Sequence, residues 1–248
     1  MDIRFIGTGC FHTKRNNTSF IIGDKILFDC GFGIITKLHD VGIEPWDIET
    51  LIVSHFHPDH TGDLINFLFR REAYTKELFK SLKRLKRPLK IIGSVGLRAF
   101  IESYAELFKY NYPSIFDGVE IIEMRGGEAR DFGEFKVSAF AVEHDSYDIA
   151  DEALGFIFEQ SGEKLGYSGD TALCENLTSN IKNADNWVID TSHKKKKEGQ
   201  VSHLDLVEVK EIAGEYPEKK FYAVHRRFEV EGNDGNLFFP NDGDIVSV

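Results

Sequence analysis

Paired cysteines and long apolar runs are both missing from this chain of 248 residues, and each absence excludes a class of protein. The three cysteines, Cys10, Cys30 and Cys174, are widely spaced and form no CxxC pair, which argues against a disulfide framework or a cysteine zinc site. The apolar runs are only strand-sized, so we expect no membrane span and no membrane partner. The N-terminus has no apolar stretch of signal-peptide length, and we therefore expect a cytoplasmic protein.

An excess of positive charge is also lacking. The 30 basic and 41 acidic side chains give a net charge of −11, which does not favour generic binding of nucleic acid. Basic residues gather instead in two stretches, Arg70–Arg87 on a predicted helix and Lys194–Lys197 in a predicted loop. A solvated face is the simplest interpretation of each stretch, and local phosphate binding is the alternative.

What the chain does contain is a succession of short β-rich runs separated by helical patterns. The runs predict strands at Ile3–Ile6, Phe20–Ile22, Ile26–Phe28, Leu51–Val53, Leu89–Ile92, Val119–Ile122, Phe135–Ala141, Leu154–Phe158, Lys164–Tyr167, Trp187–Ile189, Phe221–Val224, Leu237–Phe239 and Asp244–Val248. Helices are predicted at Gly33–Val41, Thr61–Lys86, Val95–Phe108, Leu173–Ile181 and His203–Tyr216. Ser202 and Asp205 are expected to cap the last helix. The mixture predicts one α/β layered domain over residues 1–248.

Three histidines and an aspartate crowd into the stretch SHFHPDHTGD, directly after an apolar run. In an extended segment His55 and His57 point the same way, so both can bind one metal ion. Pro58 then turns the chain, and Asp59 and His60 can face a second metal. Because buried polar side chains need partners, four such groups at the end of an apolar strand indicate a metal site.

Further ligands are available at the ends of three other predicted strands. His144, Asp170 and His225 each follow an apolar run directly or within a few residues. Each is a weak signal by itself, but all three repeat the order of strand first and ligand second. Loops at strand ends are where α/β proteins usually assemble their sites, so we expect these residues to complete the metal centre.

At these residues the chain resembles the metallo-β-lactamase superfamily of dinuclear metallohydrolases. The resemblance covers nearly the whole chain in order, from an Asp-x-Gly turn at Asp29–Gly31 through the HxHxDH motif to His225. It implies an α/β fold that forms a four-layer αββα sandwich, with two divalent metal ions in a cleft between the edges of the two sheets. We expect zinc, with manganese or iron as alternatives.

The resemblance also implies a ligand set. It assigns three ligands to one metal, three to the other and one bridge, namely His55, His57 and His144; Asp59, His60 and His225; and Asp170. A hydroxide held between the metals would be the nucleophile, and Asp59 would orient it or take up its proton. We expect Asp29 to brace the ligand loop rather than to contact a metal.

Within the superfamily the chain most resembles the ribonuclease Z branch. The opening FIGTG at Phe5–Gly9 and the strand-turn-helix at Leu89–Ile101 are similar to that branch, although Ser94 stands where the branch has a proline. The stretch His12–Asn17 stands where the branch has a substrate-contacting loop, with altered proline and spacing. His203 stands at the position of the branch's non-ligand catalytic histidine at a helix start, where an imidazole could stabilise phosphoryl charge or protonate the leaving oxygen.

The chain departs from this branch in two places. His144 and Asp170 are only 26 positions apart, which leaves room for a hairpin but not for the arm with which bacterial ribonuclease Z clamps tRNA. Ile189–Ser192 stands where the branch has a His-Glu-Ala-Thr stretch. A basic helical insertion at about residues 66–88 could replace the arm, form a dimer element or cap the cleft.

The leading hypothesis is a dinuclear metal-dependent hydrolase, a phosphodiesterase that uses the metal-bridging hydroxide, with Asp59 and His203 as catalytic residues. Its substrate would be a phosphodiester, either a small molecule or RNA, and the protein could be a homodimer. A tRNA 3′-processing endonuclease is the first alternative. A carbonyl hydrolase acting on lactones or thioesters, and a metal-binding module without turnover, remain open as well.

Overall fold

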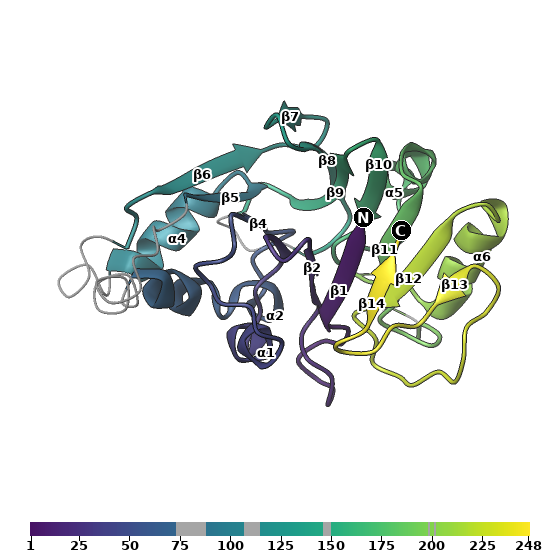
Figure 1. The fold of residues 1–248 in the computed structure, drawn as a ribbon. Coiled ribbons are helices and arrows are strands. Elements are labelled where there is room, and N and C mark those ends of the chain that lie inside the picture. The colour runs from purple at the N-terminus through teal and green to yellow at the C-terminus, as the bar shows by residue number, and fades with distance from the viewer. Residues whose placement is uncertain (73–87, 107–114, 146–149, 198, 201) are drawn as a thin grey trace.

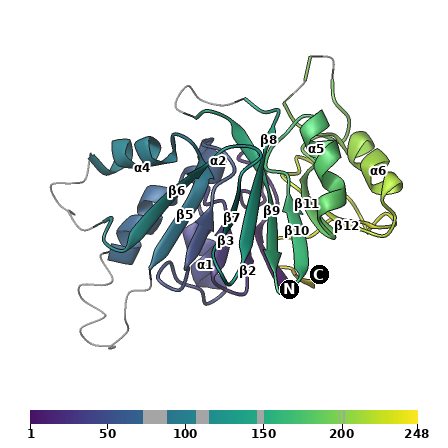
Figure 2. The same ribbon diagram turned by 90° about the horizontal axis from the view of Figure 1, so that it is seen from above.

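Two seven-stranded sheets pack face to face, and helices cover the outer face of each sheet (Figures 1 and 2). The computed structural model describes residues 1–72, 88–106, 115–145, 150–197, 199–200 and 202–248. The order of layers is helix, sheet, sheet, helix, so the predicted four-layer αββα sandwich is confirmed. Within the described ranges, no helix is both long enough and apolar enough to cross a membrane.

The first sheet has the strand order β14-β1-β2-β3-β4-β5-β6. Its strands are β1 Asp2–Gly7, β2 Ser19–Ile22, β3 Ile26–Phe28, β4 Thr50–Ile52, β5 Leu89–Ser94, β6 Val119–Met124 and β14 Ile245–Ser247. Strands β3 to β6 are parallel to one another, so their carboxyl ends share one edge of the sheet. The two ends of the chain meet at β1 and β14, which pair in an antiparallel manner (Figure 1).

The second sheet has the order β13-β12-β11-β10-β9-β8-β7. Its strands are β7 Ala129–Asp131, β8 Lys136–Val142, β9 Ala153–Gln160, β10 Glu163–Tyr167, β11 Asn186–Asp190, β12 Lys220–Val224 and β13 Leu237–Phe238. Strands β10 to β13 are parallel, and β8 runs in the same direction because both β8 and β10 are antiparallel to β9. The apolar periodicity missed β7, because all three of its residues are exposed at the sheet edge.

Of the predicted helices, the first and the last two are described in full and are shorter than expected, whereas those predicted at Thr61–Lys86 and Val95–Phe108 continue outside the described residues. The described helices are α1 Ile34–Asp40, α2 Pro58–Thr61, α4 Leu97–Glu106, α5 Glu175–Asn180 and α6 Leu206–Glu215, with a 3-10 turn at Ile181–Asn183 and further helical residues at 64–72. The predicted cap at Ser202 is wrong. Asp205 caps α6 itself, in a capping box with Glu208, so His203 precedes the helix instead of lying in its first turn.

Three apolar cores correspond to the three interfaces between the four layers. The core between the sheets is rich in aromatic rings, including Phe5, Phe20, Phe28, Phe156 and Phe158. One outer core joins the first sheet to α1, α4 and residues 64–68, and the other joins the second sheet to α5 and α6. Successive side chains of a strand point to opposite faces of its sheet and so contribute to two different cores. In β4, Leu51 faces the helices, whereas Ile52 faces the other sheet.

The basic insertion expected at residues 66–88 lies largely outside the described residues, because 73–87 are not described. One of its cations is structural. Arg71 is buried, and its Nη1 donates hydrogen bonds to the carbonyl oxygens of Pro45 and Ile48. This guanidinium therefore ties the helical residues 64–72 to the loop before β4, and it does not serve a substrate.

Gly166 in β10 allows a test of packing in the outer core between the second sheet and helices α5 and α6. A Cβ atom at Gly166 would lie 2.4 Å from the ring of Trp187, which is fully buried. We expect Gly166→Ala to lower the free energy of unfolding by about 2 kcal/mol, because the packed ring has to move. Denaturant unfolding measures the change. In the control Gly214→Ala, the new Cβ in α6 meets nothing within 4 Å, and we expect unchanged or slightly higher stability. Equal effects in the two variants would contradict this account.

Candidate metal centre

Strand ends from both sheets converge at one edge of the sandwich. His55 follows β4 of the first sheet, while Asp170 and His225 follow β10 and β12 of the second. His144 follows β8, which runs parallel to these two strands. Pro58 begins α2, and His57 directly precedes it, so the turn between strand and helix presents the remaining part of the HxHxDH motif at the same edge.

The seven residues predicted as ligands lie together in this edge. Within each of several overlapping groups, the possible ligand atoms lie within 4.8 Å of one another. The groups are His55, His57 and His144; Asp59, His60 and His225; and His55, His60 and Asp170. The two sets of three that the resemblance assigned therefore occur as spatial groups, and the binding of metal by them stays a prediction.

Asp170 occupies the centre of the cluster. Its Oδ2 atom lies 3.2 Å from Nε2 of His225, 3.3 Å from Nε2 of His60 and 3.8 Å from Nε2 of His55. Burial favours the neutral carboxyl, but the neighbouring His225 and His60 outweigh burial and hold the pKa of Asp170 well below its usual value. A bridging ligand requires an ionised oxygen between the two sets of three predicted ligands, and Oδ2 of Asp170 meets this requirement.

Asp29 braces the ligand loop, as the sequence led us to expect. Its carboxylate accepts hydrogen bonds from the amide (2.8 Å) and hydroxyl (2.8 Å) of Ser54, from Nδ1 of His60 (2.7 Å) and from the hydroxyl of Tyr167 (2.5 Å). Because the Ser54 hydroxyl donates to Asp29, it accepts from Nδ1 of His55 at 3.0 Å. Both imidazoles thus carry their proton on Nδ1 and turn the lone pair of Nε2 toward Asp170.

Two more of the histidines, His144 and His225, are oriented in the same way. Nδ1 of His144 donates to the carbonyl oxygen of Ser202 at 2.8 Å. Nδ1 of His225 donates to the hydroxyl of Ser192 at 2.7 Å, because that hydroxyl donates to Asp190, also at 2.7 Å. In each case Nε2 is left as an acceptor that faces the centre of the cluster, which is the tautomer that binds a metal.

Two buried nitrogen atoms show that the residues fit a metal ion. Nε2 of His55 and Nε2 of His60 are buried and have no hydrogen-bond partner in the described part of the chain. Leaving a buried polar atom without a partner costs about 1–3 kcal/mol, so a folded protein usually satisfies it. Imidazole nitrogens and carboxylates form a suitable donor set for zinc, manganese or iron, and a cation at this place would satisfy both atoms.

The protonation states of the clustered side chains also suit the binding of a cation. Burial lowers the pKa values of His55, His57 and His144, which keeps these ligands neutral. Burial raises the pKa of Asp59, but the neighbouring His225 and His60 outweigh it and bring the pKa to about 2. For His60, burial lowers the pKa, yet Asp170 and Asp29 raise it well above the usual value. Positive charge at the His60 ring is thus favoured, whether a proton or a metal supplies it.

Asp190 is a site residue whose function the sequence did not reveal. It ends β11 and accepts hydrogen bonds from the amides of Thr171 (3.1 Å) and Ser192 (3.0 Å), from the Ser192 hydroxyl and from Nδ1 of His203 at 2.9 Å. Asp190 and His203 form a fourth possible ligand group with Asp170 and His225. However, protein donors fill all four lone-pair directions of the Asp190 carboxylate, so this residue holds His203 and is not a metal ligand.

The N-terminal stretch His12–Asn17 makes mostly internal contacts. Arg15 pairs with Glu229 and donates to the Thr8 hydroxyl at 3.1 Å. The side-chain amide of Asn17 donates to the carbonyl oxygen of Phe32 at 3.0 Å. These contacts tie the loop to the rest of the protein.

A two-sheet sandwich that gathers seven histidine and aspartate side chains at one edge is a metal-site scaffold of the metallo-β-lactamase fold. The family model for the β-lactamase superfamily domain matches residues 24–226. The chain therefore belongs to the β-lactamase superfamily.

Solved structures with the same fold cover nearly the whole chain. The metallo-β-lactamase fold protein YhfI from Bacillus subtilis superposes with a TM-score of 0.77 at 18% identity, covering 99% of both chains. The short form of human tRNase Z has a TM-score of 0.75 at 20% identity, covering 100% of this chain and 99% of that chain. A diphosphatase of the PhnP family has a TM-score of 0.67 at 17% identity, covering 99% of this chain and 96% of that chain. Likeness at these identities shows the fold.

A curated relative shares part of the sequence. Ribonuclease BN from Escherichia coli O139:H28 is 30% identical over 155 residues, which cover 58% of this chain and 46% of that protein. The chain thus spans about half the length of the curated relatives it matches. Ribonuclease BN and tRNase Z are thus among the proteins to which the chain is similar.

The brace at Asp29 leads to a test of metal affinity. We expect Asp29→Asn to weaken zinc binding about 10- to 100-fold, because an amide cannot accept from all the donors that orient His60 and Ser54. Competition with a chelator measures the affinity. Asp242→Asn is the control, because Asp242 also accepts several hydrogen bonds, from Thr8 and Asn16, away from the ligands. Similar losses in both variants would show that Asp29 acts only through general stability.

Proposed function

We propose that this chain is a metal-dependent hydrolase of phosphodiesters, with two divalent ions held by the seven clustered residues. Membership of the superfamily and the His/Asp cluster support metal-dependent hydrolysis. The names ribonuclease BN, tRNase Z and diphosphatase among similar proteins support a phosphate ester as substrate. When bound, the ions would lower the pKa of a water molecule and neutralise charge on phosphoryl oxygens.

The pair of His203 and Asp190 is the observation on which the phosphodiester assignment depends. Burial lowers the pKa of His203, but the adjacent Asp190 outweighs burial, so the pKa is raised. Nδ1 of His203 lies 2.9 Å from Asp190 and 3.8 Å from Asp170, which places the ring directly beside the ligand cluster. A cationic ring here would favour an anionic phosphoryl group, and it could give a proton to the leaving oxygen.

Asp59 is placed to contact both the ligand cluster and a substrate. Its Oδ2 lies 3.1 Å from Nε2 of His225, inside the cluster. Together with His57 and Pro58, the same residue lines a cavity of about 430 Å³. We assign Asp59 the role of orienting the attacking water, and His203, across the cluster, the role of acting on the leaving group.

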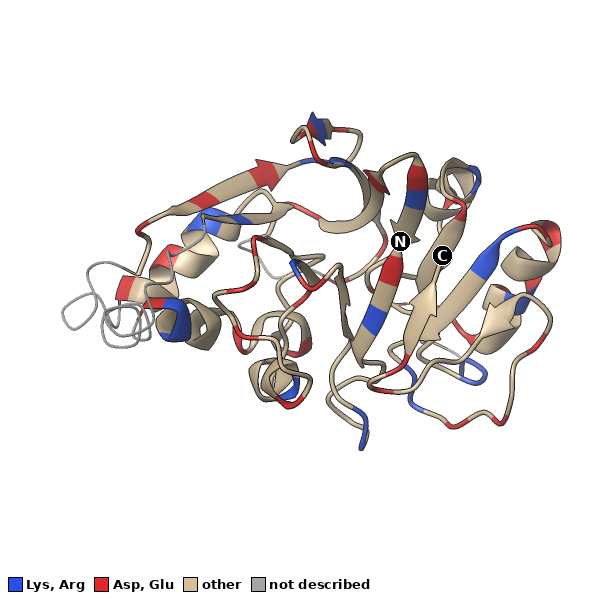
Figure 3. Ribbon diagram, in the orientation of Figure 1, with Lys and Arg blue, Asp and Glu red and all other residues tan. Residues whose placement is uncertain are grey.

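Processing of a tRNA 3′ end is the second candidate, and the names of two similar proteins favour it. Strands β9 and β10 join through a tight turn at Ser161 and Gly162, so the predicted hairpin is confirmed where a tRNA-clamping arm would otherwise stand. Acidic and basic residues are interspersed over the described elements (Figure 3). Cleavage of a precursor tRNA at its 3′ trailer would support this candidate, and absence of binding even at low salt would oppose it.

The role of His203 can be tested on a simple diester. We expect protein loaded with Zn²⁺ or Mn²⁺ to hydrolyse bis(p-nitrophenyl) phosphate, and His203→Ala to lower kcat about 100-fold at unchanged metal content. His39→Ala, which removes an exposed imidazole on α1, is the control and should retain full activity. Absence of turnover despite bound metal would favour carbonyl hydrolysis or a non-catalytic metal module.

A second variant tests whether Asp190 acts through His203. We expect Asp190→Asn to lower kcat less than His203→Ala does, because the imidazole remains but is held less firmly. At equal metal content the double variant should be no worse than His203→Ala alone, since residues that act as one unit are not additive. Metal content is matched because Asp190 also accepts from the Ser192 hydroxyl that orients His225. A steady-state comparison of the three variants decides this, and additive losses would mean that Asp190 has a separate function.

A further inference from the structure

An aromatic cavity opens directly beside the metal centre. It has a volume of about 350 Å³, and its lining includes Phe32, Pro58, Phe100 and Tyr104. Phe32 and Pro58 also line the cavity of about 430 Å³ that reaches His57 and Asp59. The two hollows therefore adjoin at Phe32 and at Pro58, the residue between two of the predicted ligands. We name the aromatic hollow the Phe32–Tyr104 cleft.

The strongly exposed aromatic side chains of the described residues gather around this cleft. In the described part of the chain, six large apolar side chains are strongly exposed, and only three of them are aromatic. Those three are Phe11 at 61%, Phe32 at 59% and Tyr104 at 47%, and all of them line one of the two hollows. Exposed aromatic rings that are gathered at one place mark a binding surface, whereas scattered ones need no explanation.

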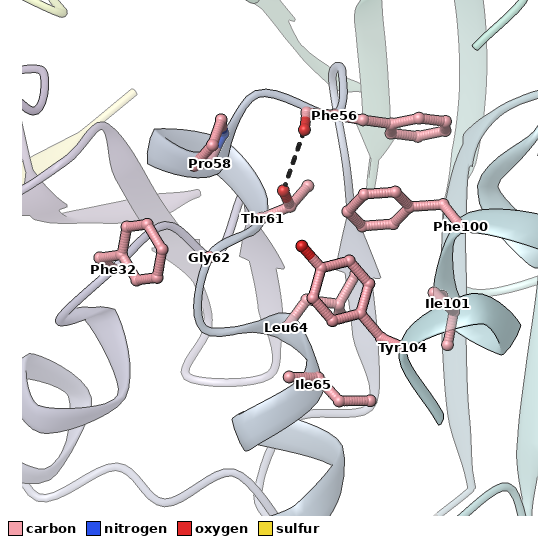
Figure 4. A pocket seen from close by; sticks show the side chains of 10 residues that line it. All are labelled: Phe32, Phe56, Pro58, Thr61, Gly62, Leu64, Ile65, Phe100, Ile101 and Tyr104. Carbon is pink, nitrogen blue, oxygen red and sulfur yellow. Dashed lines mark hydrogen bonds between the residues drawn. The ribbon is translucent and has the colours of Figure 1, made fainter. Parts of the chain in front are cut away.

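The two walls of the cleft are held in place by packing. Phe32 lies against Gly62, where any Cβ atom would come within 2.6 Å of the phenyl ring. On the opposite wall, Phe100 stacks on the buried Phe56 with ring centres 5.0 Å apart, and Tyr104 lies 5.3 Å from Phe100. Figure 4 shows Phe32 facing these rings across the opening, with the hydroxyl of Tyr104 directed into it. The cleft is thus formed before any ligand binds.

The lining of the cleft determines what it can accept. None of its ten lining residues carries a charge, so the cleft does not hold a phosphate. Aromatic faces on two sides suit a flat ring better than a flexible alkyl chain, because rings stack and alkyl chains do not. The Tyr104 hydroxyl adds a hydrogen-bonding group at the edge. A volume of this size is within the range of small-ligand pockets.

We propose that the Phe32–Tyr104 cleft binds an unpaired nucleobase next to the scissile phosphate, so that the substrate is a nucleotide diester. The inference rests on the proposed function, because it assigns the base to a substrate whose phosphodiester lies at the metal centre. Stacking tolerates any base, and a base can stack only when it is free of a partner strand. The substrate class is therefore a single-stranded end or a dinucleotide.

Hydrolysis of a dinucleotide and of its base-free analogues tests the proposal. We compare metal-loaded protein on ApA and on the two analogues that each lack one adenine. Loss of one of the two bases should lower kcat/KM about tenfold, as expected for one stacked base. Phe32→Ala should bring ApA down to the rate of that analogue and leave the analogue unchanged. Tyr104→Ala is a second variant, and Ile245→Ala on β14 is the exposed apolar control.

A binding measurement separates the two proposals. The fluorescence of 2-aminopurine riboside 5′-monophosphate should be quenched by metal-loaded protein, and Phe32→Ala should weaken this binding about tenfold. Quenching without hydrolysis of any diester would support the cleft and overturn the proposed function. Hydrolysis of ApA and of both analogues at equal rates, or competition by hexyl phosphate equal to that by AMP, would overturn the base assignment and leave the phosphodiesterase in place. Absence of both signals would overturn both proposals.

Discussion

Four carboxylates are buried at one edge of the sandwich, and the cost of burying negative charge governs what surrounds them. Asp29 and Asp190 are compensated within the protein, because each accepts hydrogen bonds from amides, hydroxyls and an imidazole. Asp59 and Asp170 face ring nitrogens instead and gain no backbone donor in the described residues. Asp29 and Asp190 therefore need no further partner, whereas the negative charge of Asp59 and Asp170 has to be balanced by positive charge. This division separates residues that orient the site from residues that would bind its cation.

The HxHxDH motif could be predicted from sequence because its geometry is local. An extended segment, a proline and a helix start fix the directions of His55 and His57 without help from the rest of the fold. The function of Asp190 could not be predicted in this way, since its donors come from Thr171 and His203 on other segments. The cap of α6 was misplaced for a related reason. Two overlapping spacings compete there, and only the box of Asp205 and Glu208 satisfies the backbone donors at the N-terminus of the helix.

The Phe32–Tyr104 cleft could not be predicted from the sequence either. Phe32 lies just before α1 and Tyr104 lies in α4, and helical periodicity assigns such residues to a core. The fold instead leaves both rings partly exposed, because the small Gly62 lets Phe32 lie flat beside α2. Nothing in the sequence spacing of Phe32 or Tyr104 indicates that the two residues line one cleft. Chemistry at the metal edge could thus be predicted from motifs, whereas the surface that chooses a substrate depends on tertiary packing.

The net charge of the chain and the Phe32–Tyr104 cleft both favour a short substrate. A chain of net charge −11 repels a long polyanion, and each further phosphate of a nucleic acid adds to that repulsion unless a basic surface meets it. The described elements intersperse the two signs of charge (Figure 3). Recognition would then depend on two features that act over one nucleotide, the metal cluster for a single phosphate and the Phe32–Tyr104 cleft for a single base. Neither feature gains from added length, so the described part of the site suits a dinucleotide or an oligonucleotide end.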